Sequence, residues 1–120
     1  MENPFLTLPP IPTYPDLRRK VVVITGIGQV GTPGLALWGN GAATACAFAR
    51  QGCKIFGCDL NLDAAENTKK RIIQELSSMG FNKASLEITV VKCDVTREDD
   101  VKGMVQKCMD TYGTIDVLIK

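Results

Sequence analysis

Histidine is absent from the 120-residue chain. Ser-His-Asp and Cys-His arrangements for nucleophilic catalysis are therefore excluded within it. Five cysteines are present, but no two of them form a C-x-x-C pair. Because structural zinc sites need Cys or His ligands at short spacings, no metal site is expected. We expect instead that the cysteines are buried thiols of a protein in the reducing cytosol.

Strong charge of one sign and long apolar runs are also lacking. The net charge is +1, and no run of like charges exceeds three residues. This pattern argues against the basic stretches that bind nucleic acid or anionic membranes. No apolar run approaches the ~20 residues of a membrane-spanning helix. We therefore expect a cytoplasmic protein that has neither nucleic acid nor a membrane as its partner.

The first segment, residues 1–19, is rich in proline, with five prolines among its first fifteen residues. It lacks the early positive charge and the uninterrupted apolar core of a secretory signal. We interpret it as an extended arm that leads into one small domain, residues 20–120.

Short apolar runs alternate with helical patterns from Lys20 onward. The β-branched run VVVIT, residues 21–25, is typical of a strand buried on both faces. Parallel strands need long crossovers, so strands separated by helices form a parallel sheet. The sequence predicts a Rossmann-type, three-layer αβα fold with strand order 3-2-1-4, truncated after the fourth strand. The expected strands are residues 21–25, 54–58, 86–92 and 115–119, and the expected helices are 42–52, 62–80 and a third that Thr96 caps in a capping box with Asp99.

The stretch GIGQVGTPGLALWGNG, residues 26–41, contains more glycines than one phosphate-binding turn needs. In one register Gly26, Gly28 and Gly31 form G-x-G-x-x-G, and a helix starts within residues 27–30. Interior Gly and Pro cost ~1 and ~3 kcal/mol relative to Ala. The later Pro33, Gly34, Gly39 and Gly41 would interrupt that helix, which disfavours this register.

A second register joins Thr25-Gly26-Ile27-Gly28-Gln29 to Gly39-Asn40-Gly41, with residues 30–38 as an insertion. A clean helical pattern follows at once, so we favour this register. The insertion is either a native loop or an artefact of the gene model, and the sequence leaves both open.

Asp59 stands at the end of the second predicted strand, near the point where the strand order reverses and ligands bind in such sheets. A carboxylate there accepts hydrogen bonds from the ribose hydroxyls of an adenosine, and it repels a 2′-phosphate. No cation follows in Leu60, Asn61 and Leu62, which favours NAD over NADP. The alternative is that Asp59 caps a turn. Asp94, just past the third strand, is similarly either an adenine contact or a cap.

Residues 18–120 resemble the N-terminal half of a short-chain dehydrogenase/reductase. The resemblance rests on VVVITG, AFARQG, Asp59, Cys93-Asp94-Val95 and YGTIDVLI. It implies that the glycine turn T-G-x-x-x-G-x-G binds pyrophosphate, that the acidic residue selects NAD, and that Asp94 and Val95 hold the adenine. The candidate cofactor-binding residues are Thr25, Gly26, Gly28, Gln29, Gly39, Asn40, Gly41, Asp59, Leu60, Asp94 and Val95.

Members of that family use a Ser and a Tyr-x-x-x-Lys for catalysis. Here Arg18 follows Tyr14 at the fourth position and Asp116 follows Tyr112, so neither tyrosine completes the motif. We assign no catalytic residue and expect no dehydrogenase activity from this chain alone. An alcohol or carbonyl substrate and a homo-oligomer are expected only for a full-length parent.

Two alternatives to an oxidoreductase remain open. The chain could be a non-catalytic dinucleotide-binding remnant or a regulatory module. It could also be a fragment of an S-adenosylmethionine-dependent methyltransferase, although Thr25-Gly26 stands where such enzymes usually have an acidic residue.

Overall fold

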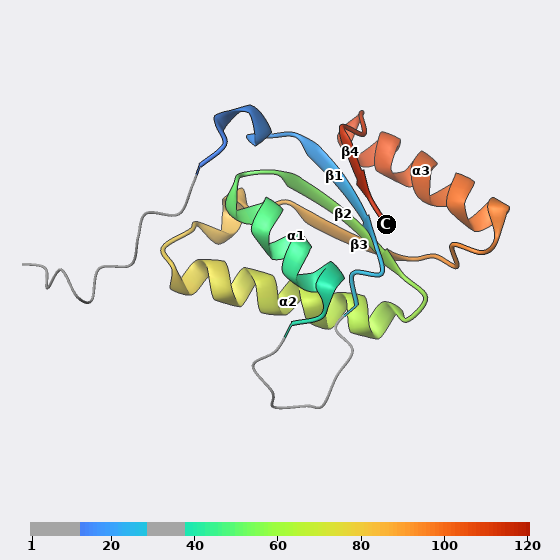
Figure 1. Ribbon diagram of the computed structural model, residues 1–120, viewed down its shortest axis with the longest axis horizontal. Helices are drawn as coiled ribbons and strands as arrows, with labels where there is room; N and C mark the ends of the chain where they lie inside the picture. Colours follow the sequence, from blue (N-terminus) through green and yellow to red (C-terminus); the bar gives the residue numbers. More distant parts are fainter. Residues whose placement is uncertain (1–12, 29–37) are drawn as a thin grey trace, which may run out of the picture.

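The computed structural model describes residues 13–28 and 38–120. Four parallel strands form one sheet in the order β3-β2-β1-β4 (Figure 1). Val22 in the centre of the sheet pairs with Ile55 on one side and Val117 on the other. The predicted fold class and strand order are confirmed. The strands are β1 (Val21–Thr25), β2 (Lys54–Asp59), β3 (Ile88–Lys92) and β4 (Val117–Ile119).

Helices cover both faces of the sheet. α1 (Asn40–Arg50) and α2 (Leu62–Ser78) lie on one face, and α3 (Glu98–Tyr112) lies on the other (Figure 1). Successive strand residues point to opposite faces. Accordingly, Val22 and Ile24 pack in the core with α1 and α2, whereas Val21 and Val23 pack with α3. Two short 3-10 helices, η1 (Pro15–Leu17) and η2 (Lys83–Ser85), lie before β1 and β3.

The start of α3 corrects one expectation. Thr96 does not cap this helix, which begins at Glu98 after Arg97 without a side-chain cap. The Thr96 hydroxyl instead donates to Asp94 Oδ1 at 2.6 Å, and the Thr96 N–H donates to the same atom at 3.0 Å. The carboxylate is a strong local acceptor that turns the threonine away from the helix.

Other boundaries differ by a few residues. β3 and β4 each start two residues later than predicted. α1 begins at Asn40 and ends at Arg50, two residues earlier at each end than predicted, and Gly39 is its N-cap. α2 ends at Ser78, two residues earlier than predicted, and its C-cap Met79 is 45% exposed. No helix in the part of the chain that the structure describes is long and apolar enough to span a membrane.

Candidate functional site

The carboxyl ends of β1, β2 and β3 lie at the same edge of the sheet, as parallel strands require. Thr25 ends β1, Asp59 ends β2, and Asp94 follows β3. The fold therefore gathers the candidate residues of three strand ends, together with the start of α1, at one edge.

The turn after β1 is anchored by Ile27. Gly26 has φ +70°, a left-handed conformation that favours glycine. The Ile27 N–H donates to the Cys58 carbonyl at 3.1 Å, and its side chain is fully buried. That side chain fills the space over Gly57, where a Cβ would overlap it. The turn is thus fixed to the end of β2 by backbone and packing together.

The two halves of the glycine stretch lie side by side. A Cβ on Gly41 would overlap the Gly26 carbonyl, and a Cβ on Gly39 would lie 4.0 Å from the Gly28 oxygen. α1 begins at Asn40, two residues before the helix predicted at 42–52. Gln29 and residues 30–37 of the expected insertion lie outside the described residues.

The Asp59 carboxylate is held by two backbone N–H groups. Gly28 donates to Oδ2 at 2.9 Å, and Asn61 donates to Oδ1 at 2.9 Å. The buried Gly28 leaves no room for a side chain, since a Cβ there would lie 2.8 Å from Oδ2 and 2.9 Å from the Ala64 Cβ. The half-buried carboxylate keeps further lone pairs for a ligand.

Asn61, rather than Asp59, caps α2. Its side chain accepts from the Ala64 N–H at 3.1 Å. Asp59 does accept from the Asn61 N–H in the turn before the helix, so part of the capping alternative is present. The helix cap itself does not require the Asp59 carboxylate.

The residues after β3 form a hydrogen-bonded turn. Hydrogen bonds from the hydroxyl and the N–H of Thr96 lower the pKa of Asp94. The Asp94 N–H donates to Asp100 Oδ2 at 3.1 Å. Asp94 therefore fixes the turn before α3, but it does not cap the helix, which has Arg97 as its N-cap and no side-chain cap. The neighbouring Val95 is 54% exposed, and Leu60 beyond β2 is 63% exposed.

Two thiols lie buried behind these strand ends. Cys58 and Cys93 belong to the cluster under α3. Burial, together with the neighbouring Cys93, raises the pKa of Cys58 to about 12. Because the thiolate is the nucleophilic form, Cys58 is inert at neutral pH and serves packing. Within the described ranges, no three Cys, Asp or Glu side chains are grouped so that they could hold a metal ion.

Sequence reasoning missed the contacts of Ile27 with Gly57 and of Gly41 with Gly26. Both join residues that are distant along the chain, so periodicity carries no signal for them. The surplus of glycines was the only hint, because close backbone approach is a common reason for a glycine in a strand or first helical turn.

The residues present fit the requirements of a dinucleotide. An exposed left-handed glycine precedes a helix that has no side-chain cap, and its first N–H groups suit a phosphate. A fixed carboxylate stands one strand away, at Asp59.

Comparisons with known proteins agree with this architecture. A family model described as Enoyl-(Acyl carrier protein) reductase matches residues 34–120, which include Gly39–Gly41 but not Thr25 to Gly28. An uncharacterized oxidoreductase of Thermotoga maritima is 34% identical over 103 residues, 86% of this chain and 33% of that protein. A dehydrogenase/reductase SDR family protein 7-like protein of Dictyostelium discoideum is 32% identical over 85% of this chain and 28% of its own.

Solved structures show the same likeness. A short chain dehydrogenase from Mycobacterium smegmatis matches with a TM-score of 0.62 and 25% identity, over 90% of this chain and 38% of that one. A hydroxysteroid dehydrogenase from Escherichia coli matches with a TM-score of 0.62 and 26% identity, over 86% and 37% of the two chains. The chain thus spans about a third of the length of these relatives. It belongs to the short-chain dehydrogenase/reductase family.

Proposed function

We propose that residues 20–120 form the NAD-binding part of a short-chain oxidoreductase. The observation that carries the proposal is the Asp59 carboxylate, which the Gly28 N–H holds at 2.9 Å beside the glycine turn. The bound nicotinamide would donate or accept hydride in exchange with an alcohol or carbonyl substrate. The residues of this chain bind and orient the dinucleotide.

The glycine turn would hold the pyrophosphate. Gly26 and Gly41 lie against each other, which lets the backbone approach a ligand closely. The N-terminus of α1 carries roughly half a positive elementary charge from the helix dipole. Thr25, Gly28, Gly39 and Asn40 complete the proposed turn, and we include Gln29 from the sequence.

Asp59 would select NAD over NADP. Its two backbone donors fix the carboxylate, so it cannot turn away from a 2′-phosphate. Neighbouring Leu60 and Asn61 supply no compensating cation. Two ribose hydroxyls, by contrast, can donate to the lone pairs that remain on the carboxylate.

The adenine would lie between the ends of β2 and β3. The exposed side chains of Leu60 and Val95 offer apolar surface there. The hydrogen bonds from Thr96 hold the Asp94 carboxylate in place, where it would accept from the adenine amino group.

Catalysis would require residues that these 120 do not contain. Tyr112 is not a substitute, because its hydroxyl lies 2.8 Å from Thr89 Oγ1 and 3.4 Å from the Ile55 carbonyl, and burial raises its pKa. We propose that this chain binds NAD without turnover, and that the substrate pocket and oligomer interfaces belong to a longer parent. A cytosolic location suits its free thiols, which include the buried Cys53 and Cys108.

Thermal shift with NAD and NADP tests the proposal. We expect NAD to raise the melting temperature of the chain more than NADP does. Asp59→Asn removes the charge, and the loss of a charge-assisted hydrogen bond, worth about 1.5–3 kcal/mol, should weaken NAD binding at least about tenfold. Asp63→Asn, on the exposed first turn of α2, is the matched control and should bind NAD normally. Equal or greater stabilisation by NADP would refute the role of Asp59.

A further inference from the structure

We propose a second binding site, at the amino ends of the strands, for a small oxyanion with an apolar body, either a carboxylate or a phosphate ester. Two cavities of about 320 and 240 Å³ adjoin there and share Gly52, Cys53, Ser85 and Glu87 as lining residues. Together we call them the amino-end trough. It lies at the opposite ends of the strands from Asp59, so this proposal does not rest on dinucleotide binding.

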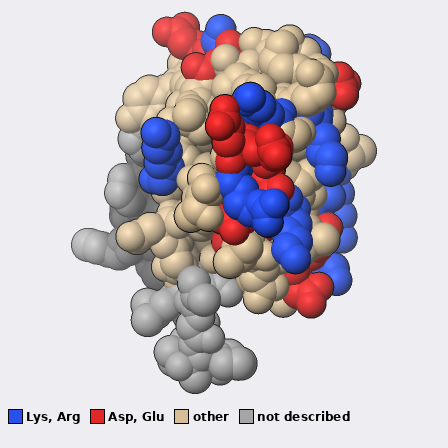
Figure 2. Space-filling model, turned by 90° about the vertical axis from the view of Figure 1, so that its right-hand side faces the viewer, with Lys and Arg blue, Asp and Glu red and all other residues tan. Residues whose placement is uncertain are grey.

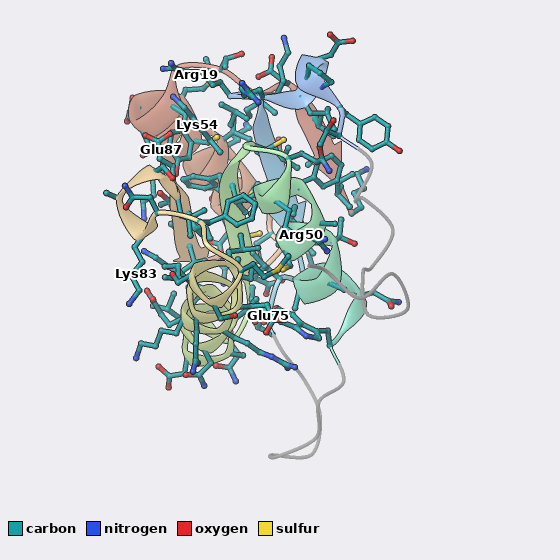
Figure 3. The ribbon with its side chains drawn as sticks, turned by 90° about the vertical axis from the view of Figure 1, so that its left-hand side faces the viewer. Arg19, Arg50, Lys54, Glu75, Lys83 and Glu87 are labelled. Atoms are coloured by element: carbon teal, nitrogen blue, oxygen red, sulfur yellow. The ribbon has the colours of Figure 1, made fainter. Side chains whose placement is uncertain are left out.

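The trough has a positive excess. Arg18 and Arg50 line the larger cavity, and Arg19 and Lys54 line the smaller one. The Lys54 Nζ lies 3.5 Å from Glu87 Oε2, so these two charges offset each other. Figure 3 shows Arg19, Lys54 and Glu87 close together on this side, with Arg50 on α1.

The three arginines keep their charge available. The Lys54–Glu87 and Lys102–Glu98 ion pairs do not involve Arg18, Arg19 or Arg50, and no ion pair is found for these three arginines within the described part of the chain. α1 ends at the trough, and Phe81 just beyond the end of α2 lines it. The two helix C-termini contribute about −0.5 elementary charge each. That is about one third of the arginine charge, so the site still attracts an anion.

The larger cavity has an apolar floor. Ala49, Cys53 and Ile88 are 3%, 5% and 5% exposed, and Phe81 and Leu86 complete the apolar wall. Inorganic phosphate would contact only the charged side chains around the cavity. An acyl or aryl group attached to the oxyanion would in addition pack against the apolar floor. The volume lies near the lower end of the ~300–1,000 Å³ usual for small-molecule sites. These properties select a short apolar body attached to the oxyanion.

The backbone holds the arginines in place. Arg19 is the one non-glycine residue with positive φ, at +67°, among the described residues. Its N–H donates to the Gly52 carbonyl at 2.9 Å, and the Lys20 N–H donates to the Leu17 carbonyl at 3.0 Å. The Arg18 Cγ lies 3.4 Å from the position a Gly52 Cβ would take, so the stem of Arg18 rests on this turn. Strained residues that are fixed in this way cluster at binding sites.

NMR titration of the ¹⁵N-labelled chain tests the site. The probes are phenyl phosphate, benzoate, inorganic phosphate and uncharged benzamide. We expect saturable shifts of the Gly52, Ser85 and Ile88 amides with the first two probes, at least fivefold weaker binding of inorganic phosphate, and none with benzamide. Tighter binding of phenyl phosphate than of benzoate would assign a phosphate ester, and the reverse order a carboxylate.

Charge-removing variants test whether Arg18 and Arg50 bind the anion. Arg18→Gln with Arg50→Gln should weaken phenyl phosphate binding about tenfold or more, as expected for lost charge-assisted hydrogen bonds. Lys102→Gln, at an exposed position of α3, removes a cation that does not line the trough. This variant should leave phenyl phosphate binding unchanged. A folded double variant that binds like the wild type would overturn the proposal. So would shifts confined to Gly26, Gly28 and Asp59, or equal binding of benzamide. If the double variant is unfolded, Arg18→Gln alone, at an exposed position, replaces it with the same expected direction.

Discussion

At the scale of single residues, Gly28 connects the glycine turn of the candidate site to Asp59. Its N–H holds Asp59 at 2.9 Å, and no room remains for a Cβ between that carboxylate and Ala64. The glycine turn and the Asp59 carboxylate therefore form one unit. Displacing either partner moves both the pyrophosphate and the ribose contacts of the proposed site.

Gly28→Ala tests this coupling. The added methyl would meet Asp59 Oδ2 at 2.8 Å, so we expect a loss of stability of about 1–3 kcal/mol from overpacking, together with loss of the NAD thermal shift. Gly103→Ala is the control, because nothing lies within 4 Å of its added Cβ. Within helix α3 that change should stabilise by about 0.5–1 kcal/mol. Urea unfolding measures both, and an unaltered NAD response in Gly28→Ala would contradict the coupling.

Local sequence patterns reached some of these residues and not others. Asp59 was found because it follows an apolar run, and its position at a strand end is a local property. The hydrogen bond to Gly28 spans 31 residues and could not be found that way. The amino-end trough was also missed, since its arginines come from the turn between η1 and β1 and from the end of α1, and they meet only after folding.

At the scale of elements, hydrogen bonds at the helix ends explain which helix starts were predicted correctly. α2 was expected from residue 62 and begins at Leu62, because Asn61 caps it and no neighbour competes. α3 was expected to have Thr96 as its cap, but the Thr96 hydroxyl donates to the Asp94 carboxylate instead. Strand order followed from the alternation of elements, and it held even where β3 and β4 proved shorter than expected.

The cap of α2 gives a prediction with an internal control. Asn61→Ala removes the acceptor of the Ala64 N–H, and we expect a loss of about 1 kcal/mol in the free energy of unfolding. Asn67→Ala makes the same substitution at an exposed position inside the same helix. There alanine is the better helix former, so stability should stay level or rise by a few tenths of a kcal/mol. Chemical denaturation measures the free energy of unfolding of both variants. Equal losses would show that the Asn61 side chain does not stabilise α2 as its cap.

For the molecule as a whole, the sheet is unevenly covered. β4 pairs with β1 alone and forms an edge, where Leu118 is 53% exposed. An apolar groove of about 380 Å³ lies beside it, between β4 and α3. Figure 2, seen from this side, shows acidic and basic side chains intermingled among uncharged ones, with no field of one sign to keep copies apart. Exposed apolar edges promote association.

We therefore expect the wild-type chain to self-associate as its concentration rises. Leu118→Lys places a charge on the edge strand and should shift the sedimentation profile toward monomer. Met79→Lys is the control, because it changes a residue of similar exposure, 45%, at the far end of α2. Equal effects of the two variants would mean that association does not use the β4 edge.

The contact between the two glycine halves has a consequence for how such a turn can vary in evolution. The Gly28 carbonyl lies 4.0 Å from the Cβ position of Gly39, so the chain leaves the site and returns to it at nearly the same point. Closing a longer loop between fixed ends costs only about 0.6 kcal/mol for each doubling of its length. The segment between Gly28 and Trp38 can therefore change in length at little thermodynamic cost, whereas Trp38 itself packs against the core. Residues can therefore be inserted into this turn without a change in the geometry of the proposed cofactor site.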